Sequence, residues 1–111
     1  MVLASPKGVP MPTKMTDDEI AQGLKRVDGW TADGGGLSRE FVFADFVDAF
    51  AFMTKVALLA ERADHHPEWS NVYNRVEIRW TTHDAGGLTD SDIALARVCD
   101  AAFDRHAHAV K

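Results

Sequence analysis

Three of the five histidines stand where predicted secondary-structure elements end. His65 and His66 precede Pro67, and proline disfavours a helical conformation for the residue before it, so the long helix upstream must end near them. His83 follows a segment of alternating polar and apolar residues and begins a glycine-bearing loop. Imidazole changes charge near neutral pH, and functional sites tend to be built at element ends. These histidines are therefore candidates for proton transfer, against the plainer interpretation of surface or capping residues.

Glu61 is a candidate partner for the paired histidines. On a helical wheel it falls among Phe50, Thr54 and Ala57 and away from the helix's charged side, so we expect it to point inward. A carboxylate in the last helical turn is opposed by the helix dipole at a cost of roughly 0.3 to 1 kcal/mol. An imidazolium at His65 or His66 would offset this cost, and Glu61 would then orient or charge that ring. A surface Glu61 on a slightly rotated helix is the alternative.

Other chemistries find weaker support. Three histidines and a carboxylate could ligate zinc, but the chain has no His-x-x-x-His or His-Glu-x-x-His spacing and no cysteine pair, so we expect no metal. Cys99 falls inside a predicted helix, where cysteine is more often a small buried residue than a nucleophile. The glycines at 34–36 and 86–87 lack the Lys-Ser/Thr sequel of a phosphate loop. Acid–base chemistry remains: hydration, dehydration, isomerisation or tautomerisation.

The elements that must position these residues alternate helices with pairs of strands. In order we predict a helix from Thr16 to about residue 27, a short strand from Trp30, a strand over 37–43, a helix over 46–62, strands over 69–73 and 75–82, and a last helix from about residue 89. Capping residues mark the three predicted helix starts: Thr16 with Glu19 for the first, Asp45 for the second, and Thr89 with Asp92 for the third. The predicted fold class is α+β, a four-stranded antiparallel sheet covered by three helices in the order α-β-β-α-β-β-α.

Length and composition fit one domain. Residues 1–13 carry three prolines and no periodic apolar pattern, which indicates a flexible N-terminal arm, and 14–111 form a single domain. The net charge of −5 argues against nucleic-acid binding. The single cysteine fits a reducing compartment, and no signal-peptide core or apolar stretch of roughly 20 residues occurs. We expect a cytoplasmic protein that binds neither nucleic acid nor membrane.

The long predicted helix is apolar over most of its circumference. Its charged residues Asp48, Lys55 and Arg62 occupy one narrow stripe. A helix that covers only one side of a sheet does not need so wide an apolar arc. Either the helix is buried throughout the core, or its second face packs against another subunit. So small a domain can scarcely surround a helix by itself, which favours a homo-oligomer.

The segment from Glu61 to Tyr73, which contains His65-His66-Pro67-Glu68-Trp69, resembles the signature of pterin-4a-carbinolamine dehydratases when it is taken with the later His83 and Asp92. The surrounding residues 81–88, Gly29-Trp30 and 41–46 also resemble this family. The likeness covers about residues 16–106.

The resemblance implies an enzyme that removes water from 4a-hydroxytetrahydropterin, without metal or cofactor, in the recycling of tetrahydrobiopterin after aromatic amino-acid hydroxylation. Catalytic roles would fall to His65, His66 and His83, with Glu61 and Asp92 in support. His65 and His66 would act around C4a, and His83 would bind and polarise the pterin. The implied substrate-binding residues are Trp30, Asp64, Pro67, Thr81, Thr82 and Asp84.

The same resemblance carries an alternative function. Family members form homodimers and homotetramers through sheet edges and the long helix, and some act as partners of a transcription factor or in the assembly of a carbon-fixing enzyme. The chain could therefore be a non-catalytic binding module on the same fold. Members that gave up catalysis should lose histidines, and the presence of all three favours the enzyme.

Overall fold

A computed structural model describes residues 13–109 of the chain. The elements are α1 (Asp17–Leu24), β1 (Thr31–Asp33), β2 (Gly36–Val42), α2 (Phe46–Ala63), β3 (Glu68–Val72), β4 (Arg75–Trp80), a 3₁₀ turn η1 (His83–Ala85) and α3 (Asp90–Ala109). The predicted order of helices and strands is confirmed, with η1 as an addition between β4 and α3. Residues 1–12, which make up nearly all of the predicted arm, lie outside the described residues.

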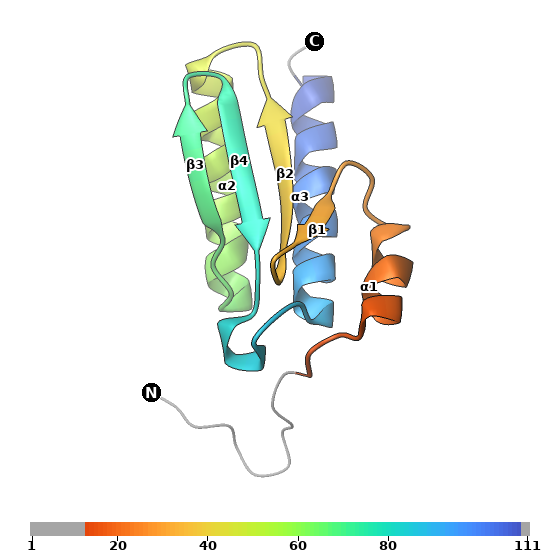
Figure 1. Cartoon of the computed structure of the whole chain (residues 1–111). Coiled ribbons are helices and arrows are strands. Elements are labelled where there is room, and N and C mark those ends of the chain that lie inside the picture. Colours follow the sequence, from red (N-terminus) through yellow and green to blue (C-terminus); the bar gives the residue numbers. More distant parts are fainter. Residues whose placement is uncertain (1–12, 110–111) are drawn as a thin grey trace.

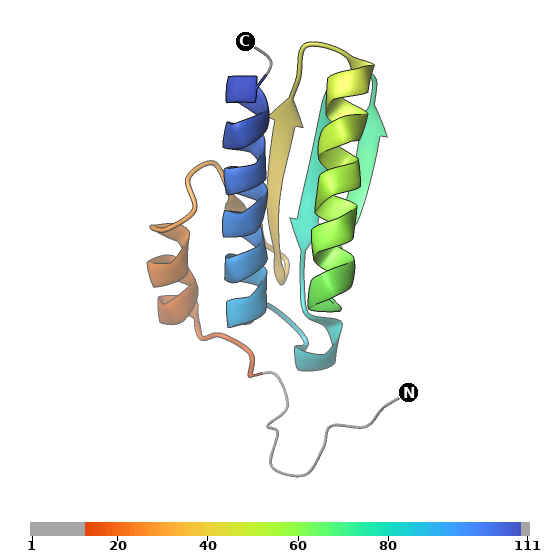
Figure 2. The same cartoon turned by 180° about the vertical axis from the view of Figure 1, so that it is seen from behind.

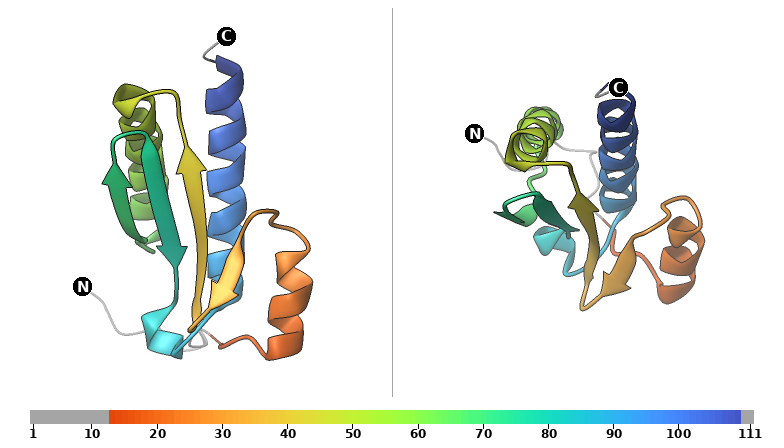
Figure 3. Two further views of the ribbon diagram at one scale, coloured as in Figure 1. Left: turned by 45° about the horizontal axis from the view of Figure 1, so that its top comes forward. Right: turned by 90° about the horizontal axis from the view of Figure 1, so that it is seen from above.

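The four strands form one antiparallel sheet in the order β1-β2-β4-β3. Helices α2 and α3 lie side by side on one face of this sheet (Figure 2), while α1 lies beside β1 at the sheet's edge (Figure 1). Seen from above, the sheet and the α2–α3 pair form two layers (Figure 3). The predicted fold class is confirmed. Within residues 13–109, no helix is long and apolar enough to cross a bilayer.

Local capping explains where the first two helices begin. The Thr16 hydroxyl accepts from the Glu19 N–H and the Glu19 carboxylate accepts from the Thr16 N–H, so the predicted capping box is complete. The Asp45 carboxylate caps α2 by accepting from the N–H of residue 48. Helix α1 ends at Leu24, three residues earlier than predicted, but Val27 is still buried, in the turn that follows.

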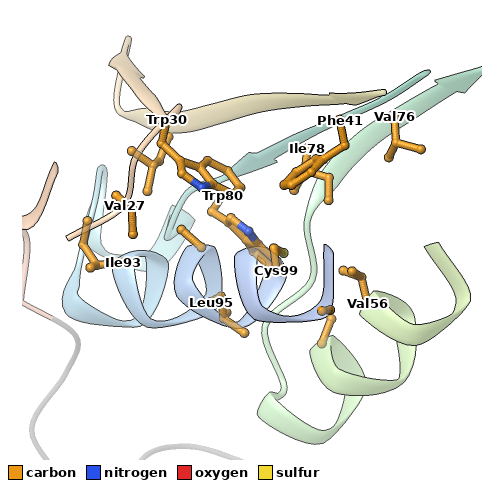
Figure 4. Close-up of a cluster of buried hydrophobic side chains, with 14 of the residues drawn as sticks. Val27, Trp30, Phe41, Val56, Val76, Ile78, Trp80, Ile93, Leu95 and Cys99 are labelled. Atoms are coloured by element: carbon orange, nitrogen blue, oxygen red, sulfur yellow. The ribbon is translucent and has the colours of Figure 1, made fainter. Parts of the chain in front are cut away.

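The core lies between the sheet and the α2–α3 pair (Figure 4). Phe41 of β2 and Phe43, one residue beyond its end, face this layer. Both pack against Phe52 and Phe103, with ring centroids 4.9 to 5.3 Å apart. The prediction of an aromatic face on this strand is confirmed. In β4 the buried residues are Val76, Ile78 and Trp80, which alternate with polar residues on the opposite face.

Within residues 13–109, helix α2 buries one of its sides. Ala49, Phe52, Val56 and Ala60 face the core, at successive helical spacings. The opposite side is exposed and largely apolar, and includes Phe46, Val47, Phe50 and Leu58. Of the two interpretations of the wide apolar arc, burial throughout the core of one chain is therefore wrong.

Candidate active site

The three candidate histidines meet at one end of the molecule, where α2 ends, β4 ends and α3 begins (Figure 1). Asp64 closes α2 with a left-handed backbone conformation, φ 53°, and the chain then passes through His65 and His66 into β3. Past the end of β4, His83 begins η1. The topology thus gathers residues separated by 18 positions in the chain.

A cavity of about 300 Å³ separates these histidines; the residues that line it are His65, His66, Thr81, Thr82, His83 and Asp84. Three of the six residues expected to bind substrate are therefore in its wall. Asp64 is exposed where it caps α2, and Pro67 lies between the histidine pair and β3; neither lines the cavity. A larger hollow of about 430 Å³ lies over the uncovered face of the sheet, and no histidine lines it.

Trp30 does not line the histidine cavity, so its expected contact with substrate stays a prediction. Its ring is buried edge-on to Phe41, with centroids 5.8 Å apart, and its indole N–H donates to the Asp100 carboxylate at 2.9 Å. A buried indole needs an acceptor for its N–H, and this one finds it in α3. Trp30 is thus part of the core in this chain (Figure 4).

His65 is the most enclosed of the three, with 16% of its side chain exposed. Its Nε2 lies 3.0 Å from the Thr81 carbonyl oxygen and 2.9 Å from Asp92 Oδ1, and its ring lies 5.7 Å from that of Trp80. Both neighbours of Nε2 are acceptors, so we assign the proton to this nitrogen. The ring is thereby tied to the cavity wall on one side and to α3 on the other.

Asp92 is fully buried and organises the start of α3. Its Oδ2 accepts from the Thr82 hydroxyl at 2.7 Å and from the Thr89 N–H at 2.9 Å. The predicted capping box is half formed: the Asp92 side chain caps Thr89, while the Thr89 hydroxyl bonds the Thr82 hydroxyl at 2.9 Å. A carboxylate that looks like a helix cap in the sequence therefore also contacts His65.

His66 is paired with Glu61 through a 2.8 Å contact between Nε2 and Oε1. The predicted contact between Glu61 and a histidine is present, but the inward orientation is wrong, because 79% of the Glu61 side chain is exposed. Helix α2 turns its other side to the sheet, so Glu61 shares the solvent-facing side with Phe50 and Thr54. A wheel gives angles about the helix axis and does not say which side meets the sheet.

His83 has a carboxylate partner that the sequence analysis did not identify. Its Nε2 lies 3.0 Å from Oε2 of Glu68, the first residue of β3. The two are neighbours because Glu68 pairs with Arg79 across the β3–β4 hairpin, and His83 follows shortly after β4 ends. The hairpin register around Asn74 was the signal that could have shown it.

Each histidine of the cavity therefore presents Nε2 to a carboxylate: Asp92, Glu61 and Glu68 respectively. An ionised carboxylate only accepts hydrogen bonds, which assigns the proton to Nε2 in each neutral ring. Among the described side chains, no three His, Cys, Asp or Glu residues form a group suited to hold a metal ion. The arrangement can donate, accept and stabilise protons on a ligand in the cavity.

Sequence comparison with known proteins finds one family. Residues 13–102 match the sequence model of a family described as pterin 4 alpha carbinolamine dehydratase. A protein of Rhizorhabdus wittichii, provisionally named as such a dehydratase, is 56% identical over 89 residues, which cover 78% of this chain and 92% of that protein. A protein of Solibacter usitatus with the same provisional name is 54% identical over 91 residues, which cover 82% of this chain and 96% of that protein.

Solved structures show the same fold. A transcriptional coactivator/pterin dehydratase from Brucella melitensis matches with a TM-score of 0.79 and 42% identity, over 81% of this chain and 98% of that one. A pterin dehydratase-like protein described as a RuBisCO assembly factor in the alpha-carboxysome matches with a TM-score of 0.57 and 25% identity, over 67% of this chain and 86% of that one.

Proposed function

The chain belongs to the pterin-4a-carbinolamine dehydratase family, and from that premise we propose that it converts 4a-hydroxytetrahydropterin to quinonoid dihydropterin and water. The observation that carries this proposal is the cavity in which His65, His66 and His83 meet, each with Nε2 against a carboxylate. Such an arrangement suits a reaction that needs an acid and a base in one place near neutral pH.

The chemistry requires two proton transfers. The C4a–O bond breaks, and the hydroxyl group leaves as water after it takes a proton from an acid. A ring N–H gives its proton to a base, and the electron pair of that bond forms the C=N bond of the product. One proton enters and one leaves, with no change in oxidation state, so the step needs no cofactor.

The histidines divide this work in the proposal. His65 and His66 are adjacent in the chain and act around C4a, while His83 binds and polarises the pterin. Glu61 and Asp92 support them by holding Nε2 and by stabilising an imidazolium when one forms. Thr81 and Thr82, which join β4 to η1, and Asp84 of η1 contact the substrate.

The substrate's chemistry indicates its source. A 4a-hydroxytetrahydropterin is the spent form of a tetrahydropterin that has served a hydroxylation. An aromatic amino-acid hydroxylase is the source that the family resemblance implies, and the product needs reduction before another round. The chain would then serve tetrahydrobiopterin recycling.

Stopped-flow spectroscopy with freshly prepared 4a-hydroxytetrahydropterin tests this function. We expect the wild-type chain to accelerate dehydration over the spontaneous rate, and His66→Ala and His83→Ala each to lower that acceleration about 100-fold or more, the range for loss of acid–base groups. His106→Ala is the control: its backbone lies in α3, 14 residues after Asp92, or about 21 Å along the helix. Unchanged rates in both cavity variants would overturn the assignment.

We also infer that copies of the chain form a homodimer or homotetramer. The exposed apolar side of α2, which contains Val47, Phe50 and Leu58, and the sheet edges β1 and β3 are the surfaces that support this. Sedimentation should show a dimer or tetramer for the wild type and a smaller species for Leu58→Glu. Lys55→Glu, on the charged stripe of the same helix, should leave the assembly intact. A monomeric wild type at micromolar concentration would contradict this.

A binding module without catalysis is the second candidate. The exposed side of α2 favours it, as do the descriptions of the two solved relatives as a coactivator and an assembly factor. A folded chain that gives no rate enhancement on the carbinolamine would make this the better account. The three histidine–carboxylate pairs favour the enzyme, because a binding surface has no need of them.

A further inference from the structure

We propose that Glu68 is a positioning residue for His83, and that Arg79 holds Glu68 in place. The catalytic consequence of this inference rests on the proposed dehydratase function. The structural part of the inference concerns the orientation and tautomer of the His83 ring, and it does not rest on that function. The family resemblance implied roles for His83, Glu61 and Asp92, whereas Glu68 stood in the resembling segment without a role, and its contacts now assign one.

The contact between Glu68 and His83 determines which ring nitrogen is available to a ligand. Glu68 Oε2 lies 3.0 Å from His83 Nε2. Because an ionised carboxylate only accepts, Nε2 carries the proton in the neutral ring and Nδ1 keeps a free electron pair. A second residue that fixes the tautomer and rotation of a histidine in this way makes the other nitrogen a defined acid or base.

Arg79 holds the far side of the same carboxylate. Its Nε lies 3.7 Å from Glu68 Oε1, and its Nη2 donates to the Gly34 carbonyl oxygen at 3.0 Å. The guanidinium lies across Gly36, where a Cβ atom would overlap it. The glycine run at 34–36, which the sequence analysis interpreted as a hairpin turn, therefore also makes room for the arginine.

The Glu68–Arg79 pair is part of the cavity system. A second cavity of about 280 Å³ adjoins the first and shares Thr81 and His83 with it; Gly35, Glu68 and Arg79 also line it. The Thr81 hydroxyl also donates to the Gly35 carbonyl oxygen at 2.7 Å. Two carbonyl oxygens of the glycine turn therefore accept hydrogen bonds, one from Arg79 and one from Thr81, which lines the histidine cavity.

His83 depends on its carboxylate more than the other histidines do. Its side chain is 78% exposed, against 60% for His66 and 16% for His65. His65 has the Trp80 ring and the Thr81 carbonyl oxygen beside it. With so little packing around it, His83 keeps a single orientation chiefly through Glu68.

Nitrogen-15 NMR of the histidine rings tests this directly and needs no substrate. At about pH 8.5, where imidazole is neutral, His83 of the wild type should show one tautomer, with a pyrrole-type Nε2 and a pyridine-type Nδ1. Glu68→Ala should give averaged shifts from both tautomers. Glu68→Gln retains an acceptor, so its His83 shifts should lie between those of the wild type and those of Glu68→Ala. Glu77→Ala removes a carboxylate from the same sheet face, next to Ile78 in β4, and should leave the His83 signals unchanged.

The kinetic arm uses the same variants. Glu68→Ala should lower kcat/KM for the carbinolamine about 10-fold, within the range for partners that orient a functional imidazole. The larger share should fall on KM, because His83 is the residue assigned to binding. Glu68→Gln should recover most of the loss, Arg79→Met should give a smaller effect in the same direction, and Glu77→Ala none. Thermal unfolding of each variant separates these effects from loss of fold.

The two proposals fail in different ways. A wild-type chain that shows the single His83 tautomer but does not dehydrate the carbinolamine defeats the proposed function and leaves the positioning contact standing. An active wild type with an unchanged His83 tautomer in Glu68→Ala overturns the positioning role. An active Glu68→Ala with wild-type kcat and KM overturns it as well.

Discussion

Two aspartates of α3 make a natural comparison. Asp92, in the first turn, is fully buried and accepts hydrogen bonds from the Thr82 hydroxyl beyond β4 and from the Thr89 N–H at the helix start. His65 Nε2 lies 2.9 Å from its Oδ1. Asp100, two turns later, is 23% exposed and accepts from the Trp30 indole at 2.9 Å and from Arg39 at 2.6 Å. Both carboxylates tie the helix to the sheet with charge-assisted hydrogen bonds.

The difference between them lies in what their partners can do. Arginine and tryptophan do not exchange protons near neutral pH, and Arg39 is further enclosed by the rings of Phe41 and Phe103, at 4.4 and 5.3 Å. Burial raises the pKa of Asp100, and its two donors oppose this. Histidine does exchange protons, and His65 faces a cavity. The same residue type on one helix is thus structural in one place and functional in the other.

Of the two aspartates, Asp92 should have the larger effect on activity when it is replaced. Asp92→Asn keeps the shape of the side chain but removes the charge beside His65, so we expect dehydration to slow about 10- to 100-fold. Stopped-flow rates measured on the folded fraction check this. Asp90→Asn, an exposed residue of the same helical turn, is the matched control and should keep the wild-type rate. Equal rates for the two variants would contradict the role assigned to Asp92 in the reaction.

Replacement of Asp100 should instead affect stability. Asp100→Asn leaves the part-buried Arg39 guanidinium without its ion pair, and loss of a hydrogen bond to a charged group costs roughly 1.5 to 3 kcal/mol. Chemical denaturation should show this loss, while the dehydration rate of the folded protein stays within about twofold. The exposed Asp104, one turn further along α3, supplies the control Asp104→Asn. A variant as stable as the wild type but catalytically impaired would reverse the roles assigned here.

Cys99, next to Asp100, should contribute the smallest effect and only in alkali. Burial raises the pKa of its thiol from 9.0 to about 12. The native state therefore holds the proton more tightly than the unfolded state does, and the stability linked to this group is present below about pH 9 and lost as pH rises toward about 12. Denaturation at several alkaline pH values should show a shallower decline for Cys99→Ala. Identical slopes for the two proteins would refute this linkage.

Local signals in the sequence were enough to predict the elements. Thr16 with Glu19 and the single Asp45 predicted two helix starts correctly, because a cap depends on residues three positions apart. The alternation of Phe41 and Phe43 with Glu40 and Val42 predicted which side of β2 is buried. The end of α1 was predicted about three residues too late, because a turn with helix-like hydrogen bonds continues past Leu24.

Parts of the site could not be predicted because they depend on how elements pack. The side of α2 that carries Glu61 was misjudged, since both sides are rich in apolar residues. Trp30 found a partner 70 residues away in Asp100, which no local pattern encodes. Glu68 became a neighbour of His83 only through the register of the β3–β4 hairpin. The family signature supplied the three histidines but none of these contacts.

The dehydration rate of the His66→Ala/His83→Ala double variant tests the central claim most directly. The variant removes both exposed histidines of the cavity and leaves His65 with Asp92 in the enclosed part. Circular dichroism would establish that it is folded before its reaction with 4a-hydroxytetrahydropterin is followed by stopped flow. We predict a rate close to that of spontaneous dehydration. A rate within about tenfold of the wild type would contradict the claim that this cavity performs the proton transfers.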